Sequence, residues 1–159
     1  IEENTRSKIR VSYSREPDEP LETGGGILRA LLLLGDGPFL VINADIWTEH
    51  PFDVCSPQGN ALAHLVLAPN SPHHPTGDFT LSGSSIERRS HNPYTYTGIG
   101  VYKPELFEGT KQKRFSLTPL LFELARAGRL SGEVYNGAWF DIGTPERLKK
   151  ARETVARFP

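Results

Sequence analysis

Apolar and polar positions alternate in blocks along the chain, and these blocks predict strands and helices in mixed order. An uninterrupted apolar run, Phe39–Ile42, stops at Asn43 and Asp45. A run of this kind is typical of a strand covered on both faces, as in a parallel sheet. Ala61–Ala68 is a second apolar run. We therefore expect a sheet with a buried centre, and polar side chains where the strand at Phe39–Ile42 ends.

Alternating positions and turn signals predict the shorter strands. Lys8–Tyr13 alternates polar and apolar residues, which is a strand pattern. Ser82-Gly83 and Asn136-Gly137 are turn sequences of the kind that close β-hairpins. The strands expected around these turns are Asp78–Leu81 with Ser84–Glu87, and Val134–Tyr135 with Ala138–Phe140, while Tyr94–Tyr102 forms a longer strand.

Helix formers bounded by capping residues predict three helices. Ile27–Leu34 is rich in leucine and ends at Gly35, Leu117–Ala127 ends before Gly128, and a last helix follows Gly143. The expected N-caps are Thr23, Thr118 and Thr144, with Pro119 and Pro145 at first helical positions. Together the elements predict a single α/β domain with a mixed, mostly parallel sheet flanked by helices.

Composition excludes several classes of function. The 159 residues fit one domain, and 18 basic against 19 acidic residues argue against a nucleic-acid-binding surface. The single cysteine excludes an internal disulfide framework and fits the reducing cytoplasm. Since no apolar run approaches the roughly 18 residues that a membrane-spanning helix needs, we expect no membrane partner. Oligomeric state cannot be read from the sequence.

Glu22–Gly26 is the first candidate for chemistry. Three glycines that open a helix allow close backbone approach, and free N–H groups there favour anions or acceptors such as a nucleobase edge. The alternative is that the glycines only permit the helix to pack closely on the sheet. The spacing fits neither a P-loop nor a dinucleotide-binding fingerprint. The sequence is compatible with both interpretations.

Asp45 and Asp141 form the second candidate. Each follows a hydrophobic segment and precedes a turn, so both can emerge at one edge of the sheet. Two converging carboxylates without a basic partner repel each other unless a cation lies between them. Carboxylate oxygens suit Mg²⁺, which takes substrate phosphates as further ligands. The alternative for Asp45 is a plain turn residue.

Four segments in order carry a resemblance to a known family. They are Leu21–Gly26, Val41–Trp47, Gly77–Phe79 and Trp139–Leu148. Together they resemble the sugar-1-phosphate nucleotidyltransferases, which have a Rossmann-like, glycosyltransferase-A-like fold. The resemblance implies transfer of a nucleoside monophosphate from an NTP to a sugar 1-phosphate, with release of pyrophosphate and no covalent enzyme intermediate. It favours UTP as the nucleotide and N-acetylmuramate 1-phosphate as the sugar, in the recycling of cell-wall peptidoglycan.

The resemblance also implies roles for individual residues. Asp45 and Asp141 would hold Mg²⁺ between the reacting phosphates. The nucleotide would be bound by Glu22, Thr23, Gly24 and Gly25, and the sugar by Asn43, Asp78, Thr97 and Gly98.

The chain departs from the family's pattern in one large respect. Family members begin with a glycine-rich loop that grips the triphosphate, and residues 1–159 contain no such loop. The resemblance therefore implies the C-terminal two-thirds of a single nucleotidyltransferase domain, without its first βα elements. We expect this chain alone to be inactive and to expose an apolar sheet edge. The other possibilities are a non-catalytic binding or regulatory domain, and a guanylyl-, thymidylyl- or uridylyltransferase for mannose or glucose 1-phosphate.

Overall fold

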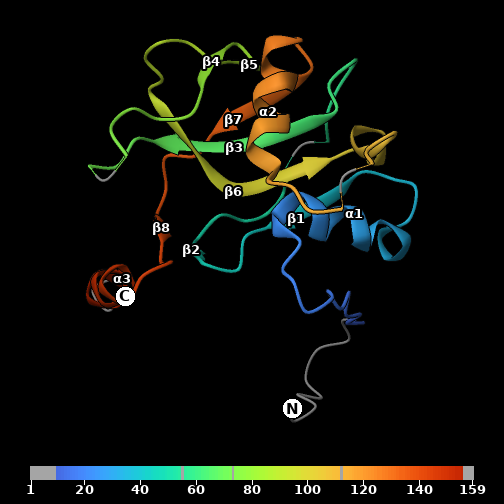
Figure 1. The fold of residues 1–159 in the computed structure, drawn as a ribbon. Coiled ribbons are helices and arrows are strands. Elements are labelled where there is room, and N and C mark those ends of the chain that lie inside the picture. Colours follow the sequence, from blue (N-terminus) through green and yellow to red (C-terminus); the bar gives the residue numbers. More distant parts are fainter. Residues whose placement is uncertain (1–9, 55, 73, 112, 156–159) are drawn as a thin grey trace.

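The part of the chain that the structure describes contains eight strands and three α-helices. This computed structural model describes residues 10–54, 56–72, 74–111 and 113–155 (Figure 1). The helices are α1 (Glu22–Leu34), α2 (Leu117–Arg126) and α3 (Pro145–Val155), with a one-turn 3₁₀ helix, η1 (Pro104–Phe107). The strands are β1 (Phe39–Ile42), β2 (Ile46–Thr48), β3 (Ala63–Pro69), β4 (Thr80–Ser82), β5 (Ser85–Glu87), β6 (Tyr94–Tyr102), β7 (Leu130–Val134) and β8 (Trp139–Asp141).

Six of these strands form one mixed sheet in the order β1-β6-β3-β7-β5-β4. The predicted mixed sheet flanked by helices is confirmed. The prediction that it is mostly parallel is wrong for the described strands, because only β3 and β7 run parallel and the other neighbours are antiparallel. An apolar run favours burial of a strand, but it carries no information on the direction of the neighbouring strands.

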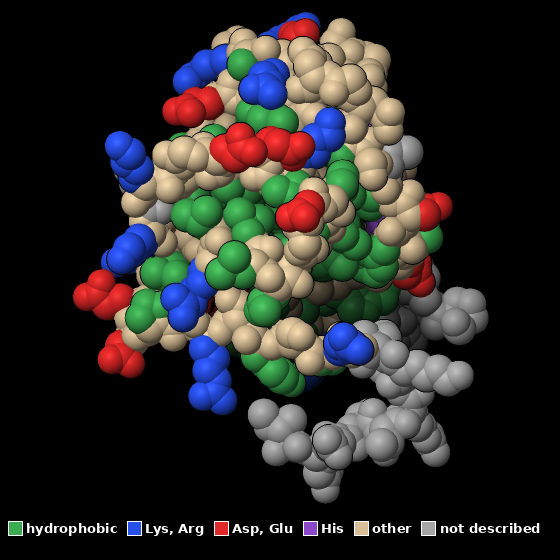
Figure 2. Space-filling model, turned by 90° about the vertical axis from the view of Figure 1, so that its right-hand side faces the viewer, with side chains coloured by type: hydrophobic (Ala, Val, Ile, Leu, Met, Phe, Trp, Pro, Cys, Tyr) green, Lys and Arg blue, Asp and Glu red, His purple; other side chains and the backbone are tan. Residues whose placement is uncertain are grey.

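The centre of the main sheet is β3, not β1. Residues 63–68 of β3 are all buried, because β6 and β7 lie on either side and α2 packs across the sheet (Figure 1). In the described part of the chain β1 pairs with β6 alone. Its Leu40 is 39% exposed and its Ile42 is 43% exposed, so the predicted burial of both faces is wrong here. The expected apolar edge is present, and Figure 2 shows hydrophobic side chains open to solvent on the side of the molecule where α1 lies.

The strand predicted at Lys8–Tyr13 is absent from residues 10–13. Residues 10–13 belong to no strand, while Lys8 and Ile9 lie outside the described residues. Val11 and Tyr13 are 64% and 74% exposed. Alternation predicts a strand only when the apolar face finds something to pack against, and here it finds nothing among the described residues.

The predicted helix starts are right for one helix and wrong for two. Thr144 Oγ1 accepts a hydrogen bond from the Arg147 N–H at 3.2 Å, as its predicted capping role requires. In contrast, α1 begins at Glu22, so Thr23 lies in the first turn, and Glu16 Oε2 accepts from the Leu21 N–H at 2.8 Å. Ser116 takes the N-cap position predicted for Thr118.

One predicted hairpin is present and the other is not. β4 and β5 pair across Ser82 and Ser85, as Ser82-Gly83 predicts. β8 follows β7 after the Asn136-Gly137 turn, but it pairs with β2 in a separate two-stranded sheet. In Figure 1, α3 lies beside β8, away from α2. This long-range pairing positions the residues considered below.

No helix in the described ranges is both long and apolar enough to cross a bilayer.

A histidine on β3, His64, is buried inside the main sheet. The His64 side chain is 9% exposed, its Nδ1 lies 3.0 Å from Ser131 Oγ, and its Nε2 has no hydrogen-bond partner among the described residues. Burial lowers the pKa of His64 from 6.5, and the Glu133 carboxylate, 3.9 Å from Nε2, opposes this shift only in part. The folded protein thus favours neutral His64.

We expect the free energy of unfolding to fall as the pH drops below 6.5, because the unfolded chain binds a proton at His64 before the folded chain does. His64→Gln should make the loss between about pH 7.5 and about pH 5.5 smaller. Urea denaturation at both pH values measures it, with exposed His91→Asn as the matched control. An equally steep loss in His64→Gln would contradict this assignment.

Candidate active site

The pairing of β2 with β8 brings Asp45 and Asp141 to one place. Ile46 lies opposite Asp141, and the Ile142 N–H donates to the Asp45 carbonyl oxygen at 2.8 Å. A Cβ atom on Gly143 would lie 3.2 Å from both Asp45 Oδ2 and Asp141 Oδ1, so the two oxygens are within twice that distance of each other. The predicted convergence of these carboxylates is therefore present in the structure.

Asp141 has a basic partner, which the sequence-based argument did not include. Arg147 Nη1 donates to Asp141 Oδ2 at 2.6 Å, and the Gly143 N–H donates to Asp141 Oδ1 at 3.0 Å. The premise that the two carboxylates have no basic partner is therefore wrong for Asp141. The available signal was closeness in the chain, because Arg147 lies in the first turn of α3, six residues after Asp141.

The two carboxylates fit Mg²⁺ held jointly with a phosphate. Both aspartates are exposed, so their oxygens are accessible. The described residues include no cluster of three or more histidine, cysteine or acidic side chains that could hold a metal. Mg²⁺ commonly uses one or two carboxylates and completes its coordination with waters and substrate phosphates. The donor set therefore suits a metal that arrives with its substrate, and the metal-binding roles of Asp45 and Asp141 stay a prediction.

A cavity of about 380 Å³ opens beside Asp141. Trp139 forms part of its wall, and the indole Nε1 donates to the Thr97 carbonyl oxygen at 2.9 Å, which fixes the ring. Its other lining residues include Ser71, Asn136, Phe140, Arg147 and Lys150. Asp141 was predicted from the sequence, but Arg147 and Lys150 were not, although their spacing of three residues on α3 indicates a shared helix face.

Asn43 and Gly98 lie together, whereas the Thr97 side chain points elsewhere. The Asn43 N–H donates to the Gly98 carbonyl oxygen at 2.9 Å, and a Cβ atom on Gly98 would lie 2.8 Å from Asn43 Cγ. Thr97 is 1% exposed, and its hydroxyl donates to the Val66 carbonyl oxygen at 2.7 Å. The Thr97 hydroxyl is thus used inside the sheet, and the predicted place of Thr97 in a sugar pocket stays a prediction.

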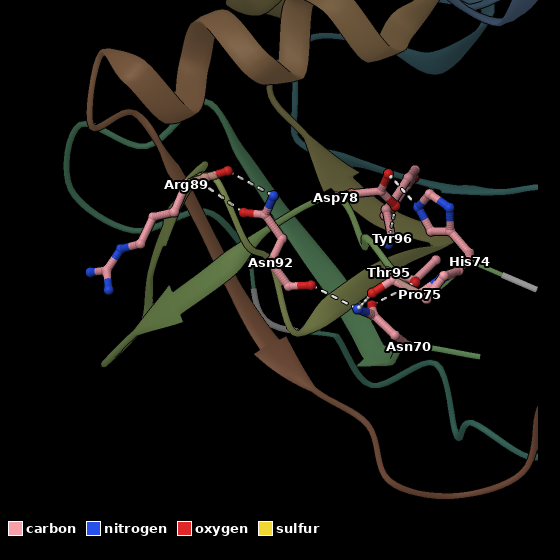
Figure 3. Close-up of polar contacts among 8 residues, drawn as sticks. All are labelled: Asn70, His74, Pro75, Asp78, Arg89, Asn92, Thr95 and Tyr96. Carbon is pink, nitrogen blue, oxygen red and sulfur yellow. Dashed lines mark hydrogen bonds and ion pairs between the residues drawn. The ribbon is translucent and has the colours of Figure 1, made fainter. Parts of the chain in front are cut away.

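Asp78 is held by protein groups on both carboxylate oxygens. Oδ2 accepts from the Tyr96 N–H at 2.9 Å, and Oδ1 lies 3.1 Å from His74 Nε2 (Figure 3). Asn70 Nδ2 braces the same loop by donating to the Asn92 carbonyl oxygen at 2.7 Å. The carboxylate is therefore rigidly placed. Its predicted contact with a sugar stays a prediction, and His74 is a partner that the sequence-based argument missed.

The glycines of α1 serve packing in this structure. The N–H groups of Gly24 and Gly25 both donate to the Phe115 carbonyl oxygen, at 3.0 and 3.2 Å. A Cβ atom on Gly24 would overlap the Phe115 ring, and one on Gly25 would overlap the Lys113 carbonyl oxygen. The expectation of free N–H groups there is wrong, and the packing alternative explains the glycines.

Glu22 and Thr23 lie at the exposed start of α1. Glu22 Oε1 accepts from Arg114 Nε at 3.3 Å. Glu22 and Thr23 line a second cavity of about 590 Å³ between α1 and β1. Their predicted nucleotide-binding roles, and those of the two glycines, stay predictions.

Comparison with known proteins first defines the class of fold. A crystal structure of a putative glucose-1-phosphate thymidylyltransferase from Bacillus anthracis, in complex with a sucrose, matches with a TM-score of 0.70 and 17% sequence identity. The match covers 91% of this chain and 65% of that chain. The fold is that of the nucleotidyltransferases.

Sequence comparison then gives the family. The chain is 41% identical over 153 residues to the N-acetylmuramate alpha-1-phosphate uridylyltransferase of Neisseria meningitidis serogroup B, and 35% identical over 167 residues to that of Caulobacter vibrioides. The matches cover 91% and 92% of this chain but only 66% of each relative. No family model matches the chain. The chain belongs to the sugar-1-phosphate nucleotidyltransferase family.

Proposed function

We propose that the protein transfers a nucleoside monophosphate from an NTP to a sugar 1-phosphate, with UTP and N-acetylmuramate 1-phosphate as the preferred pair. The convergence of Asp45 and Asp141 on Gly143, beside a cavity of about 380 Å³, is the observation that carries this proposal. Relatives named for the same uridylyl transfer, at 41% and 35% identity, support the choice of substrates.

The reaction needs positioning and charge neutralisation more than covalent chemistry. An oxygen of the sugar phosphate forms a bond to the α-phosphorus, and the bond from that phosphorus to the oxygen that bridges it to the β-phosphate breaks. Pyrophosphate leaves with that oxygen. Mg²⁺ bound at Asp45 and Asp141 would neutralise part of the negative charge that gathers on the phosphates.

The chain's own residues orient the sugar in this proposal. The Asn43 amide, next to Gly98 at the end of β1, offers both a donor and an acceptor to sugar hydroxyls. The Trp139 ring supplies a flat apolar wall against which a sugar face can pack. A cytoplasmic location and a place in the recycling of cell-wall sugars belong to the same proposal.

The test is pyrophosphate release by the full-length protein. UTP, GTP, CTP and dTTP are each combined with N-acetylmuramate, mannose or glucose 1-phosphate in the presence of Mg²⁺. We expect the highest kcat/KM with UTP and N-acetylmuramate 1-phosphate, and no turnover after chelation of the metal. Preference for another pair of NTP and sugar phosphate would identify the protein as a guanylyl-, thymidylyl- or glucose-specific uridylyltransferase instead. Nucleotide binding without turnover of any pair would identify a non-catalytic binding domain and overturn the proposal.

A further inference from the structure

Two cations on α3 face the same cavity as Asp141. Arg147 and Lys150 are three residues apart, which places them on one side of the helix, and both line the cavity of about 380 Å³. Lys149, between them, is exposed and is not part of the lining. The cavity wall thus carries two positive charges next to the carboxylate that is proposed to hold a metal.

The ion pair between Arg147 and Asp141 is close but easily broken. Arg147 Nη1 lies 2.6 Å from Asp141 Oδ2, and the two side chains are 40% and 46% exposed. Exposed pairs of this kind contribute little net stability, because water competes for both charges. The Arg147 backbone is fixed by its N–H bond to Thr144 Oγ1, so only the flexible side chain has to move.

A metal ion held by Asp45 and Asp141 would compete with Arg147 for the Asp141 carboxylate. Asp141 Oδ1 faces the side shared with Asp45, and Oδ2 faces Arg147. A divalent cation between the two aspartates would be attracted by the Asp141 carboxylate, whose charge Arg147 now neutralises. The cation would also repel the Arg147 guanidinium. A metal ion held there would therefore favour release of Arg147 into the cavity.

We propose that Arg147 is an exchangeable counter-ion that pairs with Asp141 in the free protein and binds the phosphate of the sugar 1-phosphate once metal is bound. Lys150 supplies the second positive charge. A guanidinium suits this role because its planar donors match two phosphate oxygens at once, while an ammonium is a single point charge. Trp139, on the same cavity wall, is placed to contact the sugar attached to that phosphate. The proposal rests on the metal site and the transfer reaction proposed above.

The first arm of the test measures metal binding without substrate. Mn²⁺ is titrated into the full-length protein by calorimetry, for the wild type, Arg147→Gln and the matched control Lys149→Gln. We expect Arg147→Gln to bind Mn²⁺ several-fold more tightly and Lys149→Gln to match the wild type. Unchanged or weaker Mn²⁺ binding in Arg147→Gln would overturn the exchange. Equal thermal midpoints show that the variants are folded.

The second arm measures phosphate binding at saturating Mg²⁺. We expect Arg147→Gln to weaken binding of N-acetylmuramate 1-phosphate and of inorganic phosphate by about tenfold, in line with loss of one charge-assisted contact. Lys150→Gln should have a smaller effect, Arg147→Lys should restore part of the affinity, and Lys149→Gln should have none. Equal affinity in Arg147→Gln and wild type would overturn the phosphate role.

The two arms separate this inference from the proposed function. Both binding changes without turnover of any nucleotide would support the exchange while contradicting the transfer reaction. Turnover of UTP with neither binding change would support the reaction and overturn the exchange.

Discussion

Asp45→Asn and Asp141→Asn are each expected to lower kcat/KM of the full-length protein by about 10²–10³-fold, with little effect on stability. Both carboxylates are exposed, and asparagine keeps their size while removing the charge that a metal ion needs. The Asp141 variant also loses its ion pair with Arg147, but a half-exposed pair contributes little to stability. Pyrophosphate release at increasing Mg²⁺ concentrations measures both the rate and the metal requirement.

The matched control is Asp36→Asn. Asp36 is an exposed carboxylate in the turn between α1 and β1, and it lines neither cavity. Its substitution removes the same charge, so activity at the wild-type level is expected. A wild-type rate and Mg²⁺ requirement in both Asp45→Asn and Asp141→Asn would exclude the carboxylate pair as the metal site.

Gly25→Ala is expected to reduce the free energy of unfolding by about 1–3 kcal/mol, because the added methyl group overlaps the Lys113 carbonyl oxygen. Neither the helix nor the 113–115 segment can yield easily, since the Gly24 and Gly25 N–H groups bind the Phe115 carbonyl oxygen across the same contact. Urea denaturation monitored by circular dichroism measures the change.

Gly26→Ala, one position further along α1, is the matched control. A methyl group there meets no backbone atom and only the Glu16 carboxylate, with Oε1 at 2.8 Å; this carboxylate, which also accepts from the Leu21 N–H, has to shift slightly. Alanine also favours a helix over glycine by roughly 1 kcal/mol, so Gly26→Ala should be neutral or stabilising. If Gly25→Ala were as stable as wild type but bound nucleotide more weakly, the glycines would serve the ligand and not the packing of α1.

Features with a local cause were predictable from the sequence. Thr144-Pro145 starts α3 because a threonine hydroxyl and a proline both suit the first turn of a helix, and Ser82-Gly83 closes a hairpin because Gly83 adopts a positive φ of 61°. The four ordered segments carried the family resemblance, and the comparisons confirm it.

Features that depend on distant partners were not predictable from the sequence. Asn136-Gly137 is a hairpin signal, yet β8 leaves β7 and pairs with β2, some ninety positions earlier in the chain. The sequence also contained no sign that the Gly24 and Gly25 N–H groups donate to the Phe115 carbonyl oxygen, or that the Thr97 hydroxyl donates to the Val66 carbonyl oxygen. A local segment records its own conformational preference but not which distant group will satisfy its hydrogen bonds.

By itself the sequence determined the family, the α/β class and two of the acidic residues at the candidate site. Only the tertiary structure decided that Asp45 and Asp141 meet at Gly143, and that Arg147 pairs with one of them. The physical reason is that strand pairing is chosen by burial and hydrogen bonding summed over the whole fold. The two aspartates meet because β2 and β8, which are far apart in the sequence, pair with each other.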